Sequence, residues 1–181
     1  MMQHDMSQKV IEVLNTYLDK QLLKPDRESL SGDLVGQIHQ GEQLSMDFAC
    51  DDLKDFRLMV ENLGVAYLRH FVEQTGTMIK PKQVVTDKLW SVHSYEGDYN
   101  PIHDHLTASP MGISFTTWTK VPSQIGKTAD GKDTEDYNLY NSSGVIDGYI
   151  NFTYGLNQTS DPERLRPSQS RYVKPEEGKL L

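Results

Sequence analysis

Hydrophobic residues recur at helical spacing only in the part of this chain that precedes Lys80, and the part that follows has the composition of β-structure. A helical pattern followed by a strand pattern predicts an α+β fold, because in α/β proteins the two patterns alternate along the chain. The 181 residues suffice for one domain with a hydrophobic core, or for one domain with a helical extension. We expect a helical support region at 1–80 and a β-structured core at 81–181.

Two amphipathic helices are predicted, at 8–23 and 51–74. Ser7 is a suitable N-cap for the first helix, and Pro25 follows its end. Gly76 is placed to end the second helix, since glycine readily adopts the left-handed conformation that is common there. The apolar positions at helical spacing are Val10, Ile11, Leu14, Tyr17, Leu18 and Leu22 in the first helix and Leu53, Phe56, Val60, Leu63, Tyr67 and Phe71 in the second.

Strand character begins after Pro81. Residues that favour strands are concentrated in three runs, at 83–94, 111–121 and 144–154, and a turn followed by a further strand is predicted at 172–181. Polar stretches at 123–142 and 161–170 are predicted to be loops. The segment between the two helices, 24–50, is mixed and polar and contains several glycines that interrupt regular structure.

Composition narrows the class of protein. The net charge of −8 argues against general binding to nucleic acid or to an anionic membrane surface. No apolar run has the length of a membrane span, and the N-terminus lacks the apolar core of a signal peptide. The one cysteine, Cys50, cannot form an internal disulfide, so we expect a cytoplasmic protein.

Two histidines two positions apart, His103 and His105, are the candidate metal ligands. Side chains at positions i and i+2 of an extended segment project to the same side, so both imidazoles can converge on one ion. Neutral imidazole suits zinc, copper, iron and nickel, and the loop at 97–102 is where a small-molecule site would open. Taken alone, the pair also fits two exposed histidines in a turn that bind nothing.

Asp104 and His93 are further candidates, each with an ordinary alternative. Asp104 should point away from the histidines in an extended segment; a turn could bring it back, and otherwise it is a turn carboxylate. His93 could be a third ligand, a substrate contact or a satisfied strand histidine. The chain has no phosphate-binding glycine loop, no Gly-x-Ser-x-Gly and no Cys-x-x-Cys, which removes most competing classes of enzyme.

A longer pattern surrounds the two histidines. Residues 89–105 read Leu-Trp-Ser-Val-His-Ser-Tyr-Glu-Gly-Asp-Tyr-Asn-Pro-Ile-His-Asp-His, and 110–114 read Pro-Met-Gly-Ile-Ser. In this order of a Trp-containing strand, a Gly-Asp turn, an asparagine, His-x-His and a further strand, the chain resembles the 2-oxoglutarate/Fe(II) oxygenases. It is most similar to a prolyl-hydroxylase-like branch found in marine bacterial viruses and bacteria. The resemblance covers roughly 30–181, and 34–38 also looks like the N-terminal region of that branch.

The resemblance implies a double-stranded β-helix, the jelly-roll or cupin-like fold, with supporting N-terminal helices. It implies Fe(II) as cofactor and 2-oxoglutarate as cosubstrate, in a reaction that hydroxylates a substrate and releases succinate and carbon dioxide. His103 takes the place of the first histidine in the family's His-x-Asp/Glu…His triad, and His105 takes the place of the carboxylate. Tyr95 matches a tyrosine that lines the 2-oxoglutarate pocket.

The chain departs from the family pattern in two ways. A neutral His105 in place of a carboxylate implies a three-histidine site, a shifted use of Asp104, or lost activity. The family's distal histidine and basic 2-oxoglutarate anchor are expected beyond Leu181, so the β-helix is expected to lack its last strands. The alternatives are a non-catalytic metal- or partner-binding β-domain, and a cupin-type dioxygenase in which His93 completes a set of three histidines.

The expected partner is a small-molecule or peptide substrate. A peptidyl proline, another protein side chain and a free amino acid all fit, and the negative charge weighs against a nucleic-acid base. The loop at 123–142 is expected to cover the substrate. The oligomeric state is left open by the sequence.

Overall fold

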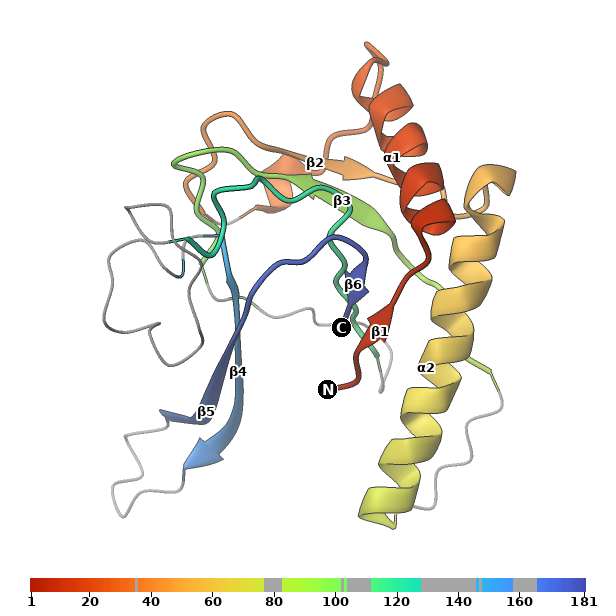
Figure 1. The fold of residues 1–181 in the computed structure, drawn as a ribbon, viewed down its shortest axis with the longest axis vertical. Coiled ribbons are helices and arrows are strands. Elements are labelled where there is room, and N and C mark those ends of the chain that lie inside the picture. Colours follow the sequence, from red (N-terminus) through yellow and green to blue (C-terminus); the bar gives the residue numbers. More distant parts are fainter. Residues whose placement is uncertain are drawn as a thin grey trace. The chain divides into compact units, whose positions relative to one another are not determined.

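The computed structural model describes residues 1–34, 36–76, 83–101, 103, 112–127, 146, 148–157 and 166–181. The chain divides into two compact units. The first comprises Met1–Thr116 and Leu180–Leu181, and the second comprises Thr117–Lys179. Both predicted helices, which are drawn in red and yellow in Figure 1, belong to the first unit.

The first predicted helix is confirmed as α1 (Gln8–Leu22). It begins after Ser7, whose backbone carbonyl accepts the N–H groups of Val10 and Ile11 at 3.0 and 3.2 Å. The Ser7 side chain makes no capping hydrogen bond, so its position was predicted correctly but its side-chain role was not. The predicted apolar face of the helix is its buried face, with Ile11, Leu14, Tyr17 and Leu18 buried.

The second predicted helix is confirmed as α2 (Lys54–Thr75), which follows a short 3-10 turn, η2 (Asp51–Leu53). Gly76 ends it in the left-handed conformation, with φ of 66°, as its place in the sequence predicts. The apolar face is buried only in its first half: Phe56 is 3% exposed, whereas Phe71, four turns later, is 41% exposed.

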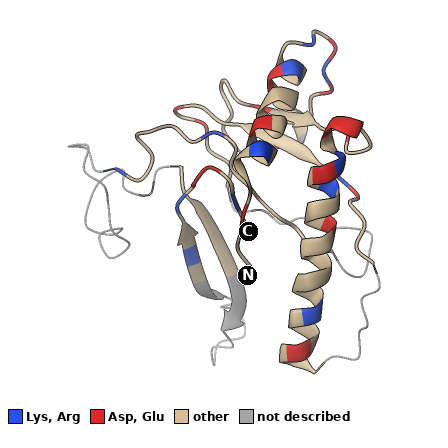
Figure 2. Ribbon diagram, turned by 45° about the vertical axis from the view of Figure 1, so that its right-hand side comes forward, with Lys and Arg blue, Asp and Glu red and all other residues tan. Residues whose placement is uncertain are grey.

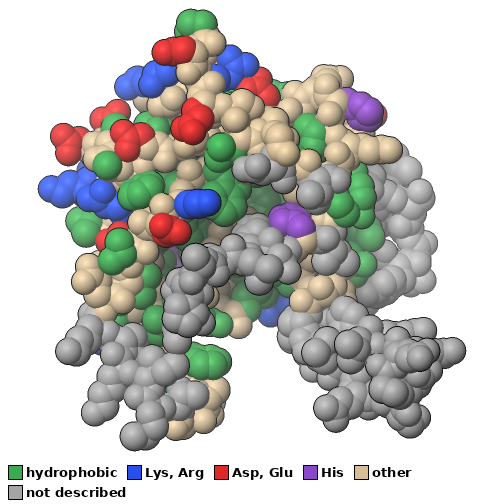
Figure 3. Space-filling model, turned by 180° about the vertical axis from the view of Figure 1, so that it is seen from behind, with side chains coloured by type: hydrophobic (Ala, Val, Ile, Leu, Met, Phe, Trp, Pro, Cys, Tyr) green, Lys and Arg blue, Asp and Glu red, His purple; other side chains and the backbone are tan. Residues whose placement is uncertain are grey.

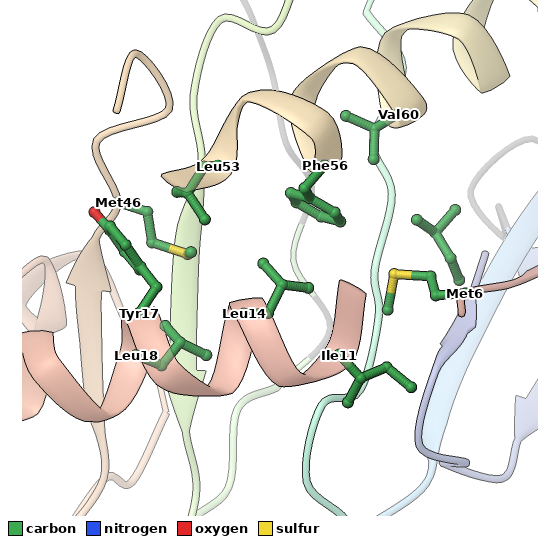
Figure 4. Close-up of a cluster of buried hydrophobic side chains, with 10 residues drawn as sticks. Met6, Ile11, Leu14, Tyr17, Leu18, Met46, Leu53, Phe56 and Val60 are labelled. Atoms are coloured by element: carbon green, nitrogen blue, oxygen red, sulfur yellow. The ribbon is translucent and has the colours of Figure 1, made fainter. Parts of the chain in front are cut away.

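The hydrophobic core of the first unit lies between α1 and the start of α2 (Figure 4). Phe56 also meets Phe115 edge to face, with ring centroids 6.0 Å apart. Charged residues of both signs occur along the two helices (Figure 2). The buried members of the core are Met6, Ile11, Leu14, Tyr17, Leu18, Met46, Leu53, Phe56, Val60 and Leu180.

A pair of short strands carries the segment that leads to the candidate site. β2 (Glu42–Ser45) pairs antiparallel with β3 (Trp90–His93), with Glu42 opposite His93. The predicted strand at 83–94 is therefore confirmed only near its end. Its first part lies along α2, where the Thr86 N–H donates a hydrogen bond to Glu61 Oε1 at 3.0 Å.

In the second unit, β4 (Ile150–Asn157) and β5 (Arg166–Val173) form an antiparallel pair. β4 begins and ends further along the chain than the strand predicted at 144–154. The loop predicted at 161–170 is wrong from Arg166 onward, because β5 occupies those residues. Antiparallel pairing is made by backbone groups and tolerates the polar side chains that suggested a loop.

The run at 111–121 does not form a strand over the described residues 112–121. In the first unit, Thr116 and Leu181 exchange two backbone hydrogen bonds, at 3.1 and 2.9 Å. In the second unit, the Trp118 carbonyl accepts the N–H of Gly178 at 2.8 Å. These are isolated pairings with the end of the chain, whereas a strand needs a continuous ladder.

The described strands form three two-stranded sheets, the third being β1 (His4–Asp5) with β6 (Lys179–Leu180), which confirms a strand within 172–181. The double-stranded β-helix stays a prediction. Most of the predicted covering loop at 123–142 lies outside the described residues, which stop at Lys127 in that stretch. Among the described residues, no helix has the length and hydrophobicity needed to cross a membrane.

Candidate functional site

His103, the first of the two predicted ligands, is exposed, and its Nδ1 lies 2.8 Å from the carbonyl oxygen of Pro101. A carbonyl oxygen can only accept, so Nδ1 carries a proton, and in the neutral ring Nε2 then carries the lone pair. Metal-binding histidines are commonly oriented by such a bond from the nitrogen that does not bind the metal. His105 and Asp104 lie outside the described residues.

Tyr95, the residue predicted to lie beside the cosubstrate, begins the turn that precedes His103. Its side chain is 54% exposed. The turn is closed by a hydrogen bond of 3.0 Å from the Asp98 N–H to the Tyr95 carbonyl. Gly97 has a φ of 86°, a conformation that glycine adopts without strain. The sequence therefore places a phenol at the surface upstream of His103.

The carboxylate of Asp98 binds backbone amides from two parts of the chain. Oδ1 accepts the N–H groups of His39 and Gln40 at 2.7 and 3.3 Å, and Oδ2 accepts the N–H of Tyr95 at 2.9 Å. The hydrogen bond from His39 is the main reason that the pKa of Asp98 lies below its usual range, and those from Tyr95, Gln40 and Gly41 act in the same direction. Asp98 is thus an ionised anchor for the segment 36–41.

A second contact joins the same two parts of the chain. The Tyr99 N–H donates to the Gln37 carbonyl at 2.8 Å, and the two residues form an isolated antiparallel bridge. A Cβ added at Gly36 would come within 1.7 Å of the Tyr99 carbonyl oxygen, so only glycine allows this approach. The segment 36–41 therefore lies directly on the residues that lead to His103.

His93 occupies a different group of side chains. Its Nε2 lies 3.0 Å from Ser91 Oγ, and it faces Glu42 across the β2–β3 pair. Glu42 in turn binds Arg27 through two hydrogen bonds, Nε to Oε2 at 2.8 Å and Nη2 to Oε1 at 2.6 Å. The bond from Arg27 is the main cause that lowers the pKa of Glu42, and His93 acts in the same direction.

An open depression of about 490 Å³ lies at the end of α1, beside the residues that follow β2. The Tyr17 hydroxyl at its wall accepts the N–H of Asp47 at 2.9 Å, and burial raises the pKa of Tyr17. The Arg27 guanidinium also borders it but is held by Glu42 and by the carbonyl of Lys24. The lining carries charges of both signs, so the depression has no clear preference for one kind of ligand.

Across the ranges that the structure describes, no three His, Cys, Asp or Glu side chains form a group that could hold a metal ion. The predicted ligand set includes His105, which lies outside those ranges. Histidine side chains do reach the surface, on the face drawn in Figure 3, where hydrophobic side chains are also exposed. Of the two predicted metal ligands, the structure therefore describes one oriented imidazole, with the backbone that holds it.

The sequence did not identify the role of Asp98 or of the segment 36–41. The Gly-Asp turn and the paired glycines Gly36 and Gly41 were the available signals, since glycine marks close backbone approach. A Cβ added at Gly41 would lie 2.4 Å from the His93 carbonyl oxygen, which is the same kind of contact as at Gly36. The sequence alone does not show which segment of the chain lies against each of these glycines.

No protein-family model, no curated protein and no solved structure matches this chain. The resemblance of 89–105 to the oxygenases therefore stays a prediction from its residues. The oriented imidazole of His103 is the structural feature on which a function can be proposed.

Proposed function

We propose that this chain is an Fe(II)/2-oxoglutarate-dependent oxygenase domain, in which His103 and His105 bind the iron and Tyr95 borders the cosubstrate. The observation that carries the proposal is the hydrogen bond between His103 Nδ1 and the Pro101 carbonyl, at 2.8 Å. It leaves Nε2 of the neutral ring as the nitrogen with a lone pair, which is what an iron ligand requires. The order of residues in 89–105 supports iron over the other metals that imidazole binds.

Iron(II), when bound, supplies the redox chemistry by which one oxygen atom enters the substrate as a hydroxyl and the other enters succinate, with release of carbon dioxide. The residues of this chain bind and orient the reactants. His103 and His105 are neutral ligands, so the site keeps more positive charge than one with a carboxylate ligand. The phenol of Tyr95 can donate a hydrogen bond to a carboxylate of 2-oxoglutarate.

The net charge of the chain bears on the class of substrate, and its cysteine content bears on its location. The net charge of −8 disfavours a nucleic-acid substrate, so we propose a small molecule or a peptide. A cytoplasmic location belongs to the same proposal, because a reducing compartment keeps iron as Fe(II) and suits a chain with one cysteine.

An anaerobic titration tests the proposal. Fe(II) and 2-oxoglutarate are added to the wild-type protein and to His103→Ala, and the visible charge-transfer band of the iron–oxo acid chelate is recorded. The band is expected in the wild type and absent in His103→Ala. His70→Ala is the matched control, since His70 is an exposed histidine on α2 and should leave the band unchanged.

The other outcomes distinguish the alternatives. A band that survives His103→Ala rules out His103 as a ligand. Iron binding without a band on addition of 2-oxoglutarate favours a metal-binding domain without this activity. Loss of iron binding in His93→Ala as well as in His103→Ala favours a site of three histidines that needs no oxo acid.

A further inference from the structure

We propose that Asp98 and Gly36 are positioning residues that set the orientation of the His103 imidazole, by holding the segment 36–41 against the residues that precede it. This inference rests on the proposed function, because it concerns the ligand of the proposed iron site. Asp98 and Gly36 act through the backbone that leads to His103. Their effect is transmitted through backbone contacts in three steps, all within the first unit.

The first step is the anchor at Asp98. Its two carboxylate oxygens accept N–H groups from His39 and Gln40 on one side and from Tyr95 on the other, at 2.7 to 3.3 Å. Hydrogen bonds to an ionised acceptor are about twice as strong as neutral ones. One carboxylate therefore fixes both the turn that begins at Tyr95 and the segment 36–41.

The second step is the contact at Tyr99. Its N–H donates to the Gln37 carbonyl at 2.8 Å, and its own carbonyl oxygen lies where a Cβ of residue 36 would be. The added Cβ would also come within 2.8 Å of the Asn100 Cα. The backbone at Tyr99 and Asn100 is thus confined by Gly36 and Gln37 on one side, so its direction into Pro101 is set by this contact.

The third step is the bond from His103 to Pro101. The Pro101 carbonyl accepts from His103 Nδ1 at 2.8 Å, so the orientation of this carbonyl decides which ring nitrogen is protonated. Proline fixes its own φ, so the orientation of its carbonyl depends on the ψ of Pro101 and on the direction of the backbone that leads into the ring. That backbone is the stretch held by Asp98 and Gly36.

The test uses the metal-free protein first. NMR of the His103 ring reports which nitrogen carries the proton. The wild type should show the Nδ1–H form, whereas Asp98→Ala, Asp98→Asn and Gly36→Ala should shift His103 towards the Nε2–H form that imidazole prefers in water. Glu96→Gln is the matched control: it removes an exposed carboxylate from the same turn and should leave the ring unchanged. A merely structural role for Asp98 would not move this signal in a folded variant.

Affinity for cobalt(II), measured by calorimetry with the metal alone, is the second readout. The three variants should bind cobalt(II) roughly 10-fold or more weakly than the wild type, the loss expected when a group that orients a ligand is removed. Amide spectra show which variants remain folded. If Asp98→Ala does not fold, the more conservative Asp98→Asn decides the question.

The results separate this inference from the proposed function. Folded variants that keep the wild-type ring form and the wild-type cobalt(II) affinity overturn the inference, even where His103→Ala abolishes binding and so supports the metal site. A wild type that does not bind cobalt(II) overturns the metal site, while a shift of the His103 ring in the variants still supports the positioning role.

Discussion

Asp98 is the residue whose charge should matter most for the candidate site. Its pKa is lowered, chiefly by the hydrogen bond from the N–H of His39. The folded protein therefore binds a proton at Asp98 less readily than the unfolded chain, in which an aspartate has a pKa of about 3.9. Its contribution to stability is therefore fully present above that value and is lost as the pH falls through the lower pKa of the folded state.

This predicts a pH-dependent difference between the wild type and Asp98→Asn. The wild type should be more stable at pH 7, by an amount that stays level down to about pH 5 and shrinks as the pH falls further. Urea unfolding at a series of pH values measures the difference. Glu96→Gln should show no such difference, and a gap between wild type and Asp98→Asn that widens in acid would contradict the role of Asp98.

The sequence predicted His103 as a metal ligand, but it did not predict the residues that orient its side chain. The spacing of His103 and His105 is visible in the sequence, because it depends on local geometry alone. The partners of Asp98 are not visible, since His39 lies 59 residues away and is brought near only by the tertiary fold. The Gly97 turn was predictable, and the docking of 36–41 on it was not.

At the level of elements, the helices were the most predictable part. Leu53 lies in η2 at the start of the predicted apolar face and is fully buried, whereas Leu58, on α2 and off that face, is 44% exposed. Leu53→Ala should lower the free energy of unfolding by about 2–5 kcal/mol. Leu58→Ala, the matched control, should change it by less than about 0.5 kcal/mol. Equal losses in chemical denaturation would show that the core is not where the apolar pattern places it.

The left-handed conformation of Gly76 at the end of α2 can be tested by substitution. Gly76 has a φ of 66°, and an L-residue in this conformation costs about 1–2 kcal/mol. Gly76→Ala should therefore destabilise the protein by about that amount in thermal or chemical unfolding. Gly32→Ala is the control, because an added Cβ meets no atom within 4 Å there and the φ is not positive. A neutral Gly76→Ala would mean that the left-handed cap does not form.

The strands were less predictable than the helices because their partners decide them. β2 lies in a segment whose polar composition predicts no strand, and it forms by pairing with β3. β5 begins Arg-Pro-Ser-Gln and is still a strand, since it pairs with β4 through its backbone and through a bond of 2.6 Å from Ser170 Oγ to Asn151 Oδ1. Conversely, Val84 has strand-favouring chemistry but lies against Gly64 of α2. Local composition cannot report such tertiary partners.

On the scale of the whole molecule, the described residues of the candidate site all belong to the first unit. Tyr95, Asp98 and His103 follow β3 directly, and the segment 36–41 precedes β2. The antiparallel pairing of β2 with β3 brings those two flanking segments to the same end of the strand pair. One strand pairing, one carboxylate and one close backbone approach thus hold the described segment that leads to His103.

Manganese(II) is a paramagnetic divalent substitute for Fe(II), and the line broadening that it causes shows directly whether a metal ion binds at His103. In amide NMR spectra, addition of manganese(II) with 2-oxoglutarate should broaden the signals of residues 98–103 first, and His103→Ala should abolish that effect. Broadening centred instead on the acidic residues Asp51 and Asp52 of η2 and Asp55 of α2, and unchanged in His103→Ala, would contradict a metal site at His103.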